Sequence, residues 1–452
     1  MARQHSSTRY GSNRCPQPRY FRQAGLKGAQ FRDERLAIQR IHEGIRKIST
    51  LRRSETSVKR QTQTLAGEWS KTMVANTLLP GGFDQDIPPT VYILGVGRLG
   101  KFMAHALTDI EAPPPVTLLS RCHVVCRRWH EEGRIMELIE GNTSHLRSGI
   151  NLKHVDQPFG PIDKLLVTTK TSDTIPALLA IRDLLRPSST VCFLQKGMGV
   201  IDEVNARIFP NSATRPQYMI GLLNHTINSR PGRAFTIVHH RQGDMYLSVV
   251  PRNIATSHQE IFAQRSLVRR MDYGWNRSSR SLLMSLTNTD ILNVRGFQYK
   301  EMLQVQLERL AVSAALEPLS VVFNCANGKL LDISAVSNLV RELLEEISMV
   351  INKLPELQGI GGIKDRFRAD RLHSYLFNFV AKAKHSTTSM LQDVRRARCT
   401  DIDFVNGYFL KRALEVGVSC PVNRMVVEMV KAKQMMMAVK EDALIPFGGR
   451  YD

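Results

Sequence analysis

The chain has 452 residues, of which 42% are hydrophobic, so it is long enough for two or three domains with buried cores. Its 62 Lys and Arg residues outnumber its 41 Asp and Glu residues, which gives a net charge of +21. Because no run of about 18 apolar residues occurs, we expect no membrane-spanning helix. The seven scattered cysteines, an odd number, exclude a disulfide framework and indicate a reducing compartment.

The first 60 residues are the most basic part of the chain, with 15 Lys or Arg against 4 Asp or Glu. The stretch before Asp33 is rich in Arg, contains Ser and has no acidic residue, as in mitochondrial transit segments. Residues 31–53 place Leu and Ile at near-helical spacing among Arg and Lys, which predicts a basic amphipathic helix. Two interpretations stay open: a segment that directs the protein to the mitochondrial matrix, or a basic arm that contacts RNA or anionic lipid.

A linker-like stretch at 61–89 ends in two prolines and precedes an apolar strand at 90–95. The strand leads into a Gly-x-Gly-x-x-Gly turn and a helical pattern, which is typical of a dinucleotide-binding fold. The first glycine permits the tight turn, the second lets backbone N–H groups approach a pyrophosphate, and the third lets the helix pack closely on the strand. The predicted cofactor-binding residues here are Gly95, Val96, Gly97, Arg98, Leu99 and Gly100.

A second buried strand, at 116–120, is followed by Arg121, where a site for NAD would carry Asp or Glu. A cation at this position favours the 2′-phosphate of NADP(H), although Arg121 could also be an ordinary solvated residue. Cys122, Cys126 and His130 follow closely, but this spacing lacks a second pair of ligands. We therefore predict NADP(H) as the cofactor and no metal site.

Beyond this point the pattern separates into two regions. Strand-like runs alternate with helical patterns at 174–185 and 201–208, which predicts a parallel sheet covered on both faces. The strand-like runs lie at 164–168, 190–194 and 219–223, and two more, at 234–239 and 245–250, look like a closing hairpin.

From about residue 257 onward the hydrophobic periodicity is helical. The predicted helices lie at 297–322, 333–354, 367–383, 401–416 and 422–437. We therefore predict an α/β Rossmann-type dinucleotide-binding domain at 90–254 and an all-α C-terminal domain at 255–452. The basic extension at 1–60 and the linker at 61–89 precede them.

Several short runs, in the same order along the chain, resemble the ketopantoate reductase family. Besides the glycine turn they lie at 165–170, 194–199, 309–313, 318–319, 324–328, 389–394 and 401–407. The resemblance covers roughly residues 90–440. It implies a Rossmann domain joined to a helical domain of the ketopantoate reductase type, with NADPH and a branched 2-keto acid bound between them. It also implies that a lysine of the helical domain protonates the ketone oxygen while asparagines and a serine hold the substrate.

The sequence departs from that pattern on one helical face. Arg309 stands at the catalytic lysine, and Ser313 and Glu317 stand at two asparagines. A guanidinium has a pKa above about 12, so it is a poor proton donor, although it can polarise a carbonyl. The three positions recur every four residues and share a face, which the resemblance makes the substrate wall. Near a protein surface, the Glu317 carboxylate would repel an anionic keto acid by about 4 kcal/mol at 4 Å.

Other positions implied by the resemblance are changed or kept. Lys196 replaces an asparagine on the opposite wall, so we expect it to pair with Glu317 across the cleft, unless both face solvent. Lys170 matches a lysine beside cofactor and substrate, and Ser389 matches the substrate-binding serine. Asp401 replaces a glutamate by a shorter carboxylate. The catalytic candidates are thus Arg309, Lys196, Lys170 and Asp401, and the substrate-binding candidates are Ser313, Glu317 and Ser389.

Two functions follow. In the first, the chain keeps the NADP(H)-binding fold, its reductase chemistry is weakened or lost, and residues 31–60 meet RNA or the mitochondrial translation machinery. In the second, it is an active NADPH-dependent 2-dehydropantoate 2-reductase, or a reductase of a related 2-keto acid, that serves coenzyme A synthesis. Lys196 would then supply the proton that Arg309 cannot. A dimer is compatible with either function.

Overall fold

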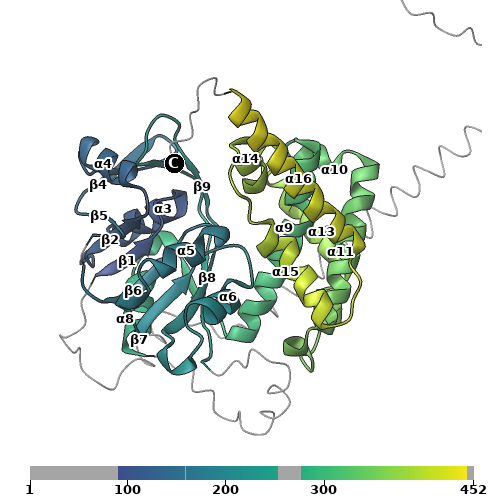
Figure 1. The fold of residues 1–452 in the computed structure, drawn as a ribbon, viewed down its shortest axis with the longest axis horizontal. Coiled ribbons are helices and arrows are strands. Elements are labelled where there is room, and N and C mark those ends of the chain that lie inside the picture. The colour runs from purple at the N-terminus through teal and green to yellow at the C-terminus, as the bar shows by residue number, and fades with distance from the viewer. Residues whose placement is uncertain (1–89, 158, 253–275, 445–452) are drawn as a thin grey trace, which may run out of the picture. The chain divides into compact units, whose positions relative to one another are not determined.

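The computed structural model describes residues 90–157, 159–252 and 276–444 (Figure 1). The predicted transit segment, the basic helix at 31–53 and the linker at 61–89 lie outside these residues. Within the described ranges, no helix is both long and apolar enough to cross a membrane.

The N-terminal domain is built on an eight-stranded sheet with the order β12-β11-β8-β7-β6-β1-β2-β5. The six strands from β8 to β5 run parallel, and β11 is antiparallel to β8. The strands of this sheet are β1 (Val91–Leu94), β2 (Val116–Ser120), β5 (Asn151–His154), β6 (Ile162–Val167), β7 (Leu185–Phe193), β8 (Gln217–Leu223), β11 (Met245–Val249) and β12 (Val294–Gly296).

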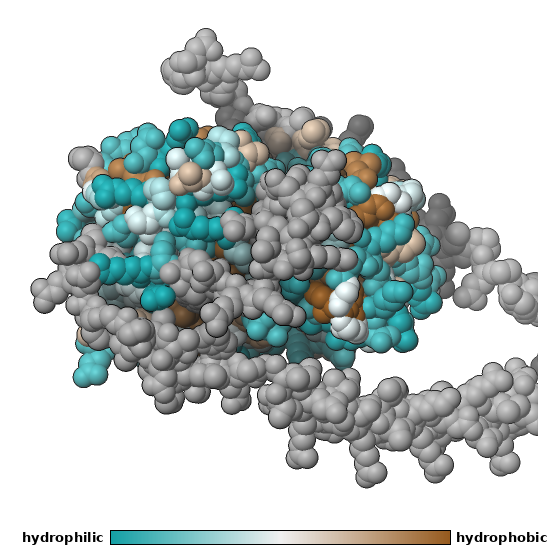
Figure 2. All heavy atoms as spheres, turned by 90° about the horizontal axis from the view of Figure 1, so that it is seen from below, coloured by the Kyte–Doolittle hydropathy of each residue, from teal (hydrophilic) through white to brown (hydrophobic). Residues whose placement is uncertain are grey.

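Helices cover both faces of this sheet, as the alternating pattern predicts. Successive residues of β1 face opposite sides: Ile93 joins a core with α3 (Arg98–Leu107) and α8 (Arg277–Thr287), and Leu94 joins another with α5 (Thr174–Leu179) and α6 (Val200–Arg207). The remaining helices of the domain are α4 (His123–Glu131) and the short 3-10 helices η1 (Thr171–Asp173), η2 (Arg182–Leu184), η3 (Ser212–Thr214) and η5 (Asp290–Leu292). On the face shown in Figure 2, hydrophilic side chains predominate.

The predicted hairpin at 234–250 is wrong, because its two strands belong to different sheets. Strand β10 (Thr236–Arg241) lies in a four-stranded sheet with the order β4-β3-β10-β9, whereas β11 lies in the large sheet. Phe235 packs on Trp129 with 4.7 Å between ring centroids, which holds this stretch on the small sheet's side. The other strands of the small sheet are β3 (Met136–Glu140), β4 (Thr143–Arg147) and β9 (Thr226–Ser229).

The sheet domain extends beyond its predicted end at residue 254. Strand β12 pairs in parallel with β11, and α8 packs on β6 and β7. Asn276 caps α8 and donates to the carbonyl of Ser188 at 2.8 Å, and Ser278 hydrogen-bonds to the carbonyl of Asp163. Residues 277–296 therefore complete the sheet domain, although the predicted boundary placed them in the helical domain and α8 was not among the predicted helices.

The C-terminal domain is all-helical, as predicted, and α9 (Tyr299–Phe323) runs through its centre. A capping box between Gln298 and Glu301 begins α9, which is buried on most sides because six other helices pack on it. The other helices are α10 (Asn327–Leu331), α11 (Ser334–Lys353), α12 (Ile363–Arg366), α13 (Ala369–Ala381), α14 (Ser389–Arg395), α15 (Ile402–Glu415) and α16 (Pro421–Leu444), with the 3-10 helix η6 (Pro355–Leu357).

Candidate functional site

The glycine turn between β1 and α3 has the geometry that its three glycines predict. Gly95 has φ +114°, which favours glycine. A Cβ on Gly100 would overlap the carbonyl oxygen of Gly95, so the third glycine allows the helix to approach the strand. A Cβ on Gly97 would meet nothing within 4 Å, so the backbone is open where a pyrophosphate would lie. Val96 and Leu99 pack against the core, and Arg98 is half-buried.

The first turn of α3 is free to bind an anion. No side chain caps this helix end, and its first turn contains no acidic residue. The Thr168 hydroxyl donates to the carbonyls of Leu94 and Gly95, both at 3.1 Å, and so fixes the turn from the neighbouring strand β6. Unpaired N–H groups at a helix N-terminus attract phosphate. The residues present therefore fit the pyrophosphate of a dinucleotide.

Arg121 lies directly after β2, at the same sheet edge as the glycine turn. Its Nη2 is 3.8 Å from Oδ1 of Asp173 in η1, and both side chains are more than 40% exposed. Such an exposed pair is weak, worth about 0–1 kcal/mol, so the guanidinium can exchange it for a phosphate. Asp173 was not among the predicted site residues, since nothing in the sequence pairs it with Arg121.

Lys170 joins the two domains. Its Nζ is 2.5 Å from Oδ1 of Asp393 in α14 and donates to the carbonyl of Cys399 at 3.2 Å. This lysine follows β6, so the sheet edge and the helical domain meet at it. Asp393 was missed as a site residue, although it lies inside the resembling run at 389–394.

Asp401 forms a second bridge between the domains. Its Oδ1 accepts the backbone N–H of Ser172 at 3.1 Å. Burial raises the pKa of Asp401 above its ordinary value, although this hydrogen bond and Lys170 act in the opposite direction. Nearby, the N–H of Met198 donates to the carbonyl of Phe404 at 3.0 Å, and a Cβ on Gly197 would come within 2.7 Å of Phe404.

Arg309, Ser313 and Glu317 follow one another at four-residue intervals along α9, as predicted. Within the described ranges, no hydrogen bond or ion pair engages the Arg309 guanidinium. Burial lowers the pKa of Arg309, and the nearby hydroxyls of Tyr375 and Tyr246 raise it. Arg309 is thus a partly desolvated cation that is available to an anion, and the two tyrosines were not foreseen.

Glu317 and Ser389 contact each other. The Ser389 hydroxyl donates to Oε2 of Glu317 at 3.3 Å, and Glu317 is 8% exposed. This hydroxyl is the group that the resemblance assigns to the substrate. A carboxylate therefore occupies the donor that an anionic substrate would use.

Lys196 does not form the expected ion pair with Glu317: among the residues described, no carboxylate lies within 4.0 Å of its Nζ. The residue is exposed to solvent, but the protein around its ammonium group still removes part of its hydration. Glu317 raises the pKa of Lys196, but desolvation together with Arg98 and Arg309 lowers it, and the net direction is downward. Lys196 is therefore an ammonium that releases its proton more easily than an ordinary lysine does.

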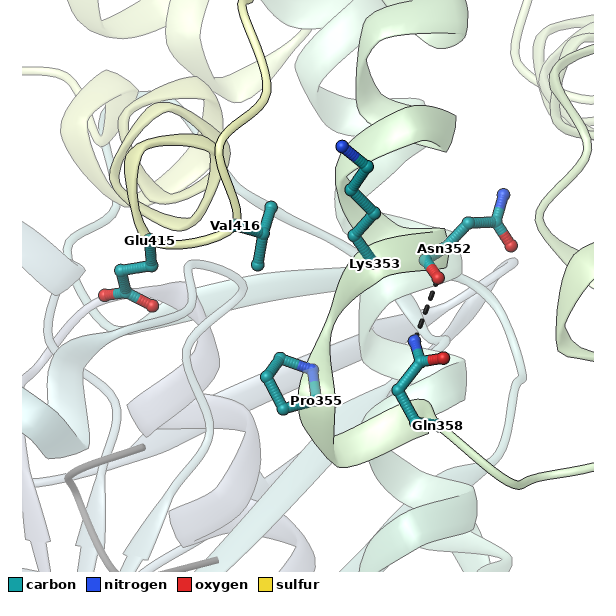
Figure 3. A pocket seen from close by; sticks show the side chains of 6 residues that line it. All are labelled: Asn352, Lys353, Pro355, Gln358, Glu415 and Val416. Atoms are coloured by element: carbon teal, nitrogen blue, oxygen red, sulfur yellow. Dashed lines mark hydrogen bonds between the residues drawn. The ribbon is translucent and has the colours of Figure 1, made fainter. Parts of the chain in front are cut away.

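A surface pocket and a cluster of two histidines with an aspartate include none of these residues. A surface pocket on the helical domain contains none of the predicted site residues; it is lined by Asn352, Lys353, Pro355, Gln358, Glu415 and Val416 (Figure 3). His123, His154 and Asp156 lie close enough together to hold a metal. However, the two histidine rings stack with 3.5 Å between centroids and 10° between planes, so their nitrogen lone pairs do not converge on one point. His130, in turn, accepts a hydrogen bond from Arg134.

Comparison with known proteins gives two family matches. Residues 91–252 match the family model "Ketopantoate reductase PanE/ApbA", and residues 301–434 match its C-terminal model. A probable 2-dehydropantoate 2-reductase of Schizosaccharomyces pombe is 25% identical over 352 residues, which cover 76% of this chain and 96% of that protein. The cytochrome B translational activator CBS2 of Saccharomyces cerevisiae is 22% identical over 379 residues, which cover 78% of this chain and 97% of that protein.

Solved structures share the fold. A ketopantoate reductase from Ralstonia eutropha matches with a TM-score of 0.58 and 18% sequence identity. A D-mandelate dehydrogenase matches with a TM-score of 0.58 and 16% sequence identity, and its structure contains NADH and anilino(oxo)acetate. Each match covers 77% of this chain and 99% of the other. The glycine turn, the domain order and both family matches agree, and the chain is a diverged member of the ketopantoate reductase family.

Proposed function

We propose that this chain binds NADP(H), that its reductase chemistry is weakened or lost, and that it acts in the mitochondrial matrix on RNA or the translation machinery. The hydrogen bond between Ser389 and Glu317 carries the catalytic part of the proposal. It supports the proposal because a serine engaged by Glu317 is not available to hold a substrate, and the Glu317 carboxylate would repel an approaching keto acid.

The open backbone at Gly97 and the uncapped start of α3 support binding of the dinucleotide. Arg121 favours the 2′-phosphate of NADP(H) over the bare ribose of NAD(H). When bound, a reduced nicotinamide supplies hydride to a ketone carbon. The chain itself must then hold the keto acid and deliver a proton to its oxygen.

The side chains of α9 are poorly suited to holding a keto acid and to protonating its oxygen. Arg309 can attract the substrate carboxylate or polarise the ketone, but its guanidinium holds its proton too tightly to be an efficient acid. Glu317 opposes the binding of the anion, and the hydroxyl of Ser389 is engaged. Turnover of a 2-keto acid should therefore be far below that of a typical enzyme.

A steady-state assay with NADPH and ketopantoate tests this part of the proposal. We expect the protein to turn over well below about 1 per second, the lower end of typical enzyme rates. The triple variant Arg309→Lys, Ser313→Asn and Glu317→Asn should gain activity because it restores the acid and removes the repulsion. Turnover at or above about 1 per second by the unmodified chain would contradict the proposal.

The alternative, an active reductase of ketopantoate or a related keto acid, is favoured by one observation. Lys196 lies close enough to Glu317 and Arg309 to interact with their charges, is unpaired among the described residues, and has a lowered pKa, so it could act as the proton donor. If the unmodified chain is active, Lys196→Met should abolish the activity, whereas Lys196→Arg should keep the charge without restoring the proton donor. Activity that survives Lys196→Met would remove this role.

The RNA part of the proposal is supported by the basic composition of residues 1–60 and by the similarity to a protein named as a translational activator. A basic segment attracts phosphates without regard to sequence, and the attraction weakens as salt rises. Deletion of residues 31–60 should reduce the amount of RNA that copurifies at low salt. If no RNA binds the full chain at low salt, the RNA role fails.

A further inference from the structure

Two short basic runs flank α14 on the helical domain. Residues 382–385 read Lys-Ala-Lys-His and residues 395–398 read Arg-Arg-Ala-Arg, and all six basic side chains are exposed. From 382 to 398 the sole acidic residue is Asp393, which is engaged by Lys170 of the sheet domain. The local positive charge is therefore not balanced by a neighbouring carboxylate on this stretch.

Backbone hydrogen bonds join the first run to the start of α10. The N–H of Gly328 donates to the carbonyl of Lys384 at 2.9 Å, and the N–H of Asn327 donates to that of Ser386 at 3.1 Å. The next residue, Lys329, is also exposed. In Figure 1, α10 and α14 lie at the same end of the helical domain.

The second run is fixed to the end of α9. Nε of Arg395 donates to Oδ1 of Asn324 at 3.0 Å, and its Nη2 donates to the Asn324 carbonyl at 3.3 Å. Asn324 ends α9, and α10 begins three residues later. We call the resulting surface the α14 basic patch; it comprises Lys329, Lys382, Lys384, His385, Arg395, Arg396 and Arg398.

Exposed aromatic rings adjoin the α14 basic patch. Phe323, next to Asn324, is 45% exposed, and Phe379, three residues before Lys382, is 41% exposed. Burying an apolar ring is favourable, so an exposed phenylalanine is available to a partner. Cations that bind a phosphate backbone, together with aromatic rings on which bases stack, are the combination found in proteins that bind single strands.

We propose that the α14 basic patch, with Phe323 and Phe379, binds single-stranded RNA. The inference rests on the RNA role proposed above, but it places a contact surface on the folded helical domain, apart from residues 31–60. Lys and Arg side chains hold the phosphates, and the two rings stack on unpaired bases. Duplex RNA binds less well because its bases are already stacked on each other.

The test measures binding of the full-length protein to a fluorescein-labelled single-stranded RNA of about 20 nucleotides by fluorescence anisotropy. The patch variant combines Lys382→Glu, Lys384→Glu, Arg396→Glu and Arg398→Glu, and it leaves Arg395 in place because that side chain holds α9. We expect at least tenfold weaker binding at moderate salt. With about 0.7 counterions released per contact, the slope of log affinity against log salt should fall by about 3.

A matched control distinguishes the effect of where the cations lie from the effect of the protein's net charge on RNA binding. Lys300→Glu, Arg341→Glu, Lys364→Glu and Arg186→Glu change four other exposed cations, so the control chain has the same net charge as the patch variant. Its affinity should stay within about threefold of the unmodified chain. Thermal melting of both variants shows whether each is folded. Equal losses in the two variants would contradict the proposal, because net charge alone would then explain the binding.

The aromatic part of the proposal is tested separately. Phe323→Ala with Phe379→Ala removes both stacking rings, so it should weaken single-stranded binding by about 30-fold or more and should leave duplex binding unchanged. Leu414→Ala, at a side chain that is 75% exposed elsewhere, serves as the control. Equal effects on single-stranded and duplex RNA would overturn the stacking role.

The outcomes distinguish this proposal from the function on which it rests. If the patch variant binds RNA normally while deletion of 31–60 removes binding, the RNA role stands and the α14 basic patch is not its site. If the unmodified chain binds no RNA at low salt, both fail. Binding to vesicles of anionic lipid that exceeds binding to RNA would also overturn the proposal.

Discussion

The nucleotide edge of the sheet and the α9 wall of the cleft differ in what builds them. The glycine turn presents backbone N–H groups and open space, and its geometry depends on glycines at 95, 97 and 100. The α9 wall presents the side chains of Arg309, Ser313 and Glu317, and we propose that these three residues weaken its chemistry while the helix itself is intact. A site made of backbone is kept as long as the fold is kept, whereas a site made of side chains can be lost on an intact fold.

The largest contrast is expected within the glycine turn itself. Gly100→Ala forces a Cβ onto the Gly95 carbonyl and should destabilise the fold by about 3 kcal/mol or more. Gly97→Ala meets no atom within 4 Å, so it should leave the melting temperature nearly unchanged and yet weaken NADPH binding by at least tenfold. Thermal melting and calorimetric titration measure the two effects. Tight NADPH binding by the Gly97 variant would show that the pyrophosphate lies elsewhere.

A smaller effect is expected on the α9 wall. Glu317→Gln removes a negative charge and keeps a hydrogen-bond acceptor for Ser389. Because a carboxylate repels an anion at short range, the affinity for ketopantoate in the presence of NADPH should rise about tenfold. Calorimetry on the NADPH-saturated protein measures this. An unchanged affinity for ketopantoate would mean that Glu317 is not on the substrate wall.

The free energy of unfolding should depend on pH because Asp401, which bridges the two domains, has a shifted pKa. Burial raises the pKa of Asp401, so the folded chain holds this proton more tightly than the unfolded chain does. This difference in proton binding stabilises the folded chain fully at a pH below the ordinary aspartate pKa. The stabilisation is lost as the pH rises through the raised pKa of the folded chain. Asp401→Asn should therefore be more stable than the unmodified chain at pH 7 and nearly equal to it near pH 3.5. Urea unfolding at both pH values checks the sign.

The smallest effect is expected at Arg121. Asp173→Asn removes the exposed partner of this guanidinium and should strengthen NADPH binding by no more than about fivefold, with little change for NADH. Arg121→Ala should reduce the preference for NADPH. If NADPH and NADH respond equally to both substitutions, Arg121 does not contact the 2′-phosphate.

The sequence was sufficient for features that depend on local patterns. The glycine turn, the sheet covered on both faces and the long helices of the C-terminal domain follow from spacing and periodicity. Strand partners do not follow, because the apolar run of β10 fits either sheet, and contacts with Trp129 and α3 decide between them. The helix α8 was not predicted, and only its contacts with β6 and β7 assign residues 277–287 to the sheet domain.

At the site, helical periodicity placed Arg309, Ser313 and Glu317 on one face correctly. It could not supply their partners, since these come from distant segments. Glu317 contacts Ser389 rather than Lys196, and Lys170 contacts Asp393. Opposite charges alone predicted an ion pair between Glu317 and Lys196. Which side chains meet depends on the distances between their positions in the fold, and these do not follow from the sequence.

We infer that the nucleotide site is kept while the substrate wall is altered. Calorimetric titration of the full-length protein with NADPH, with and without ketopantoate, tests both parts. We expect micromolar or tighter binding of NADPH that saturating ketopantoate leaves unchanged. No binding of NADPH, or an affinity that ketopantoate raises tenfold or more, would contradict it.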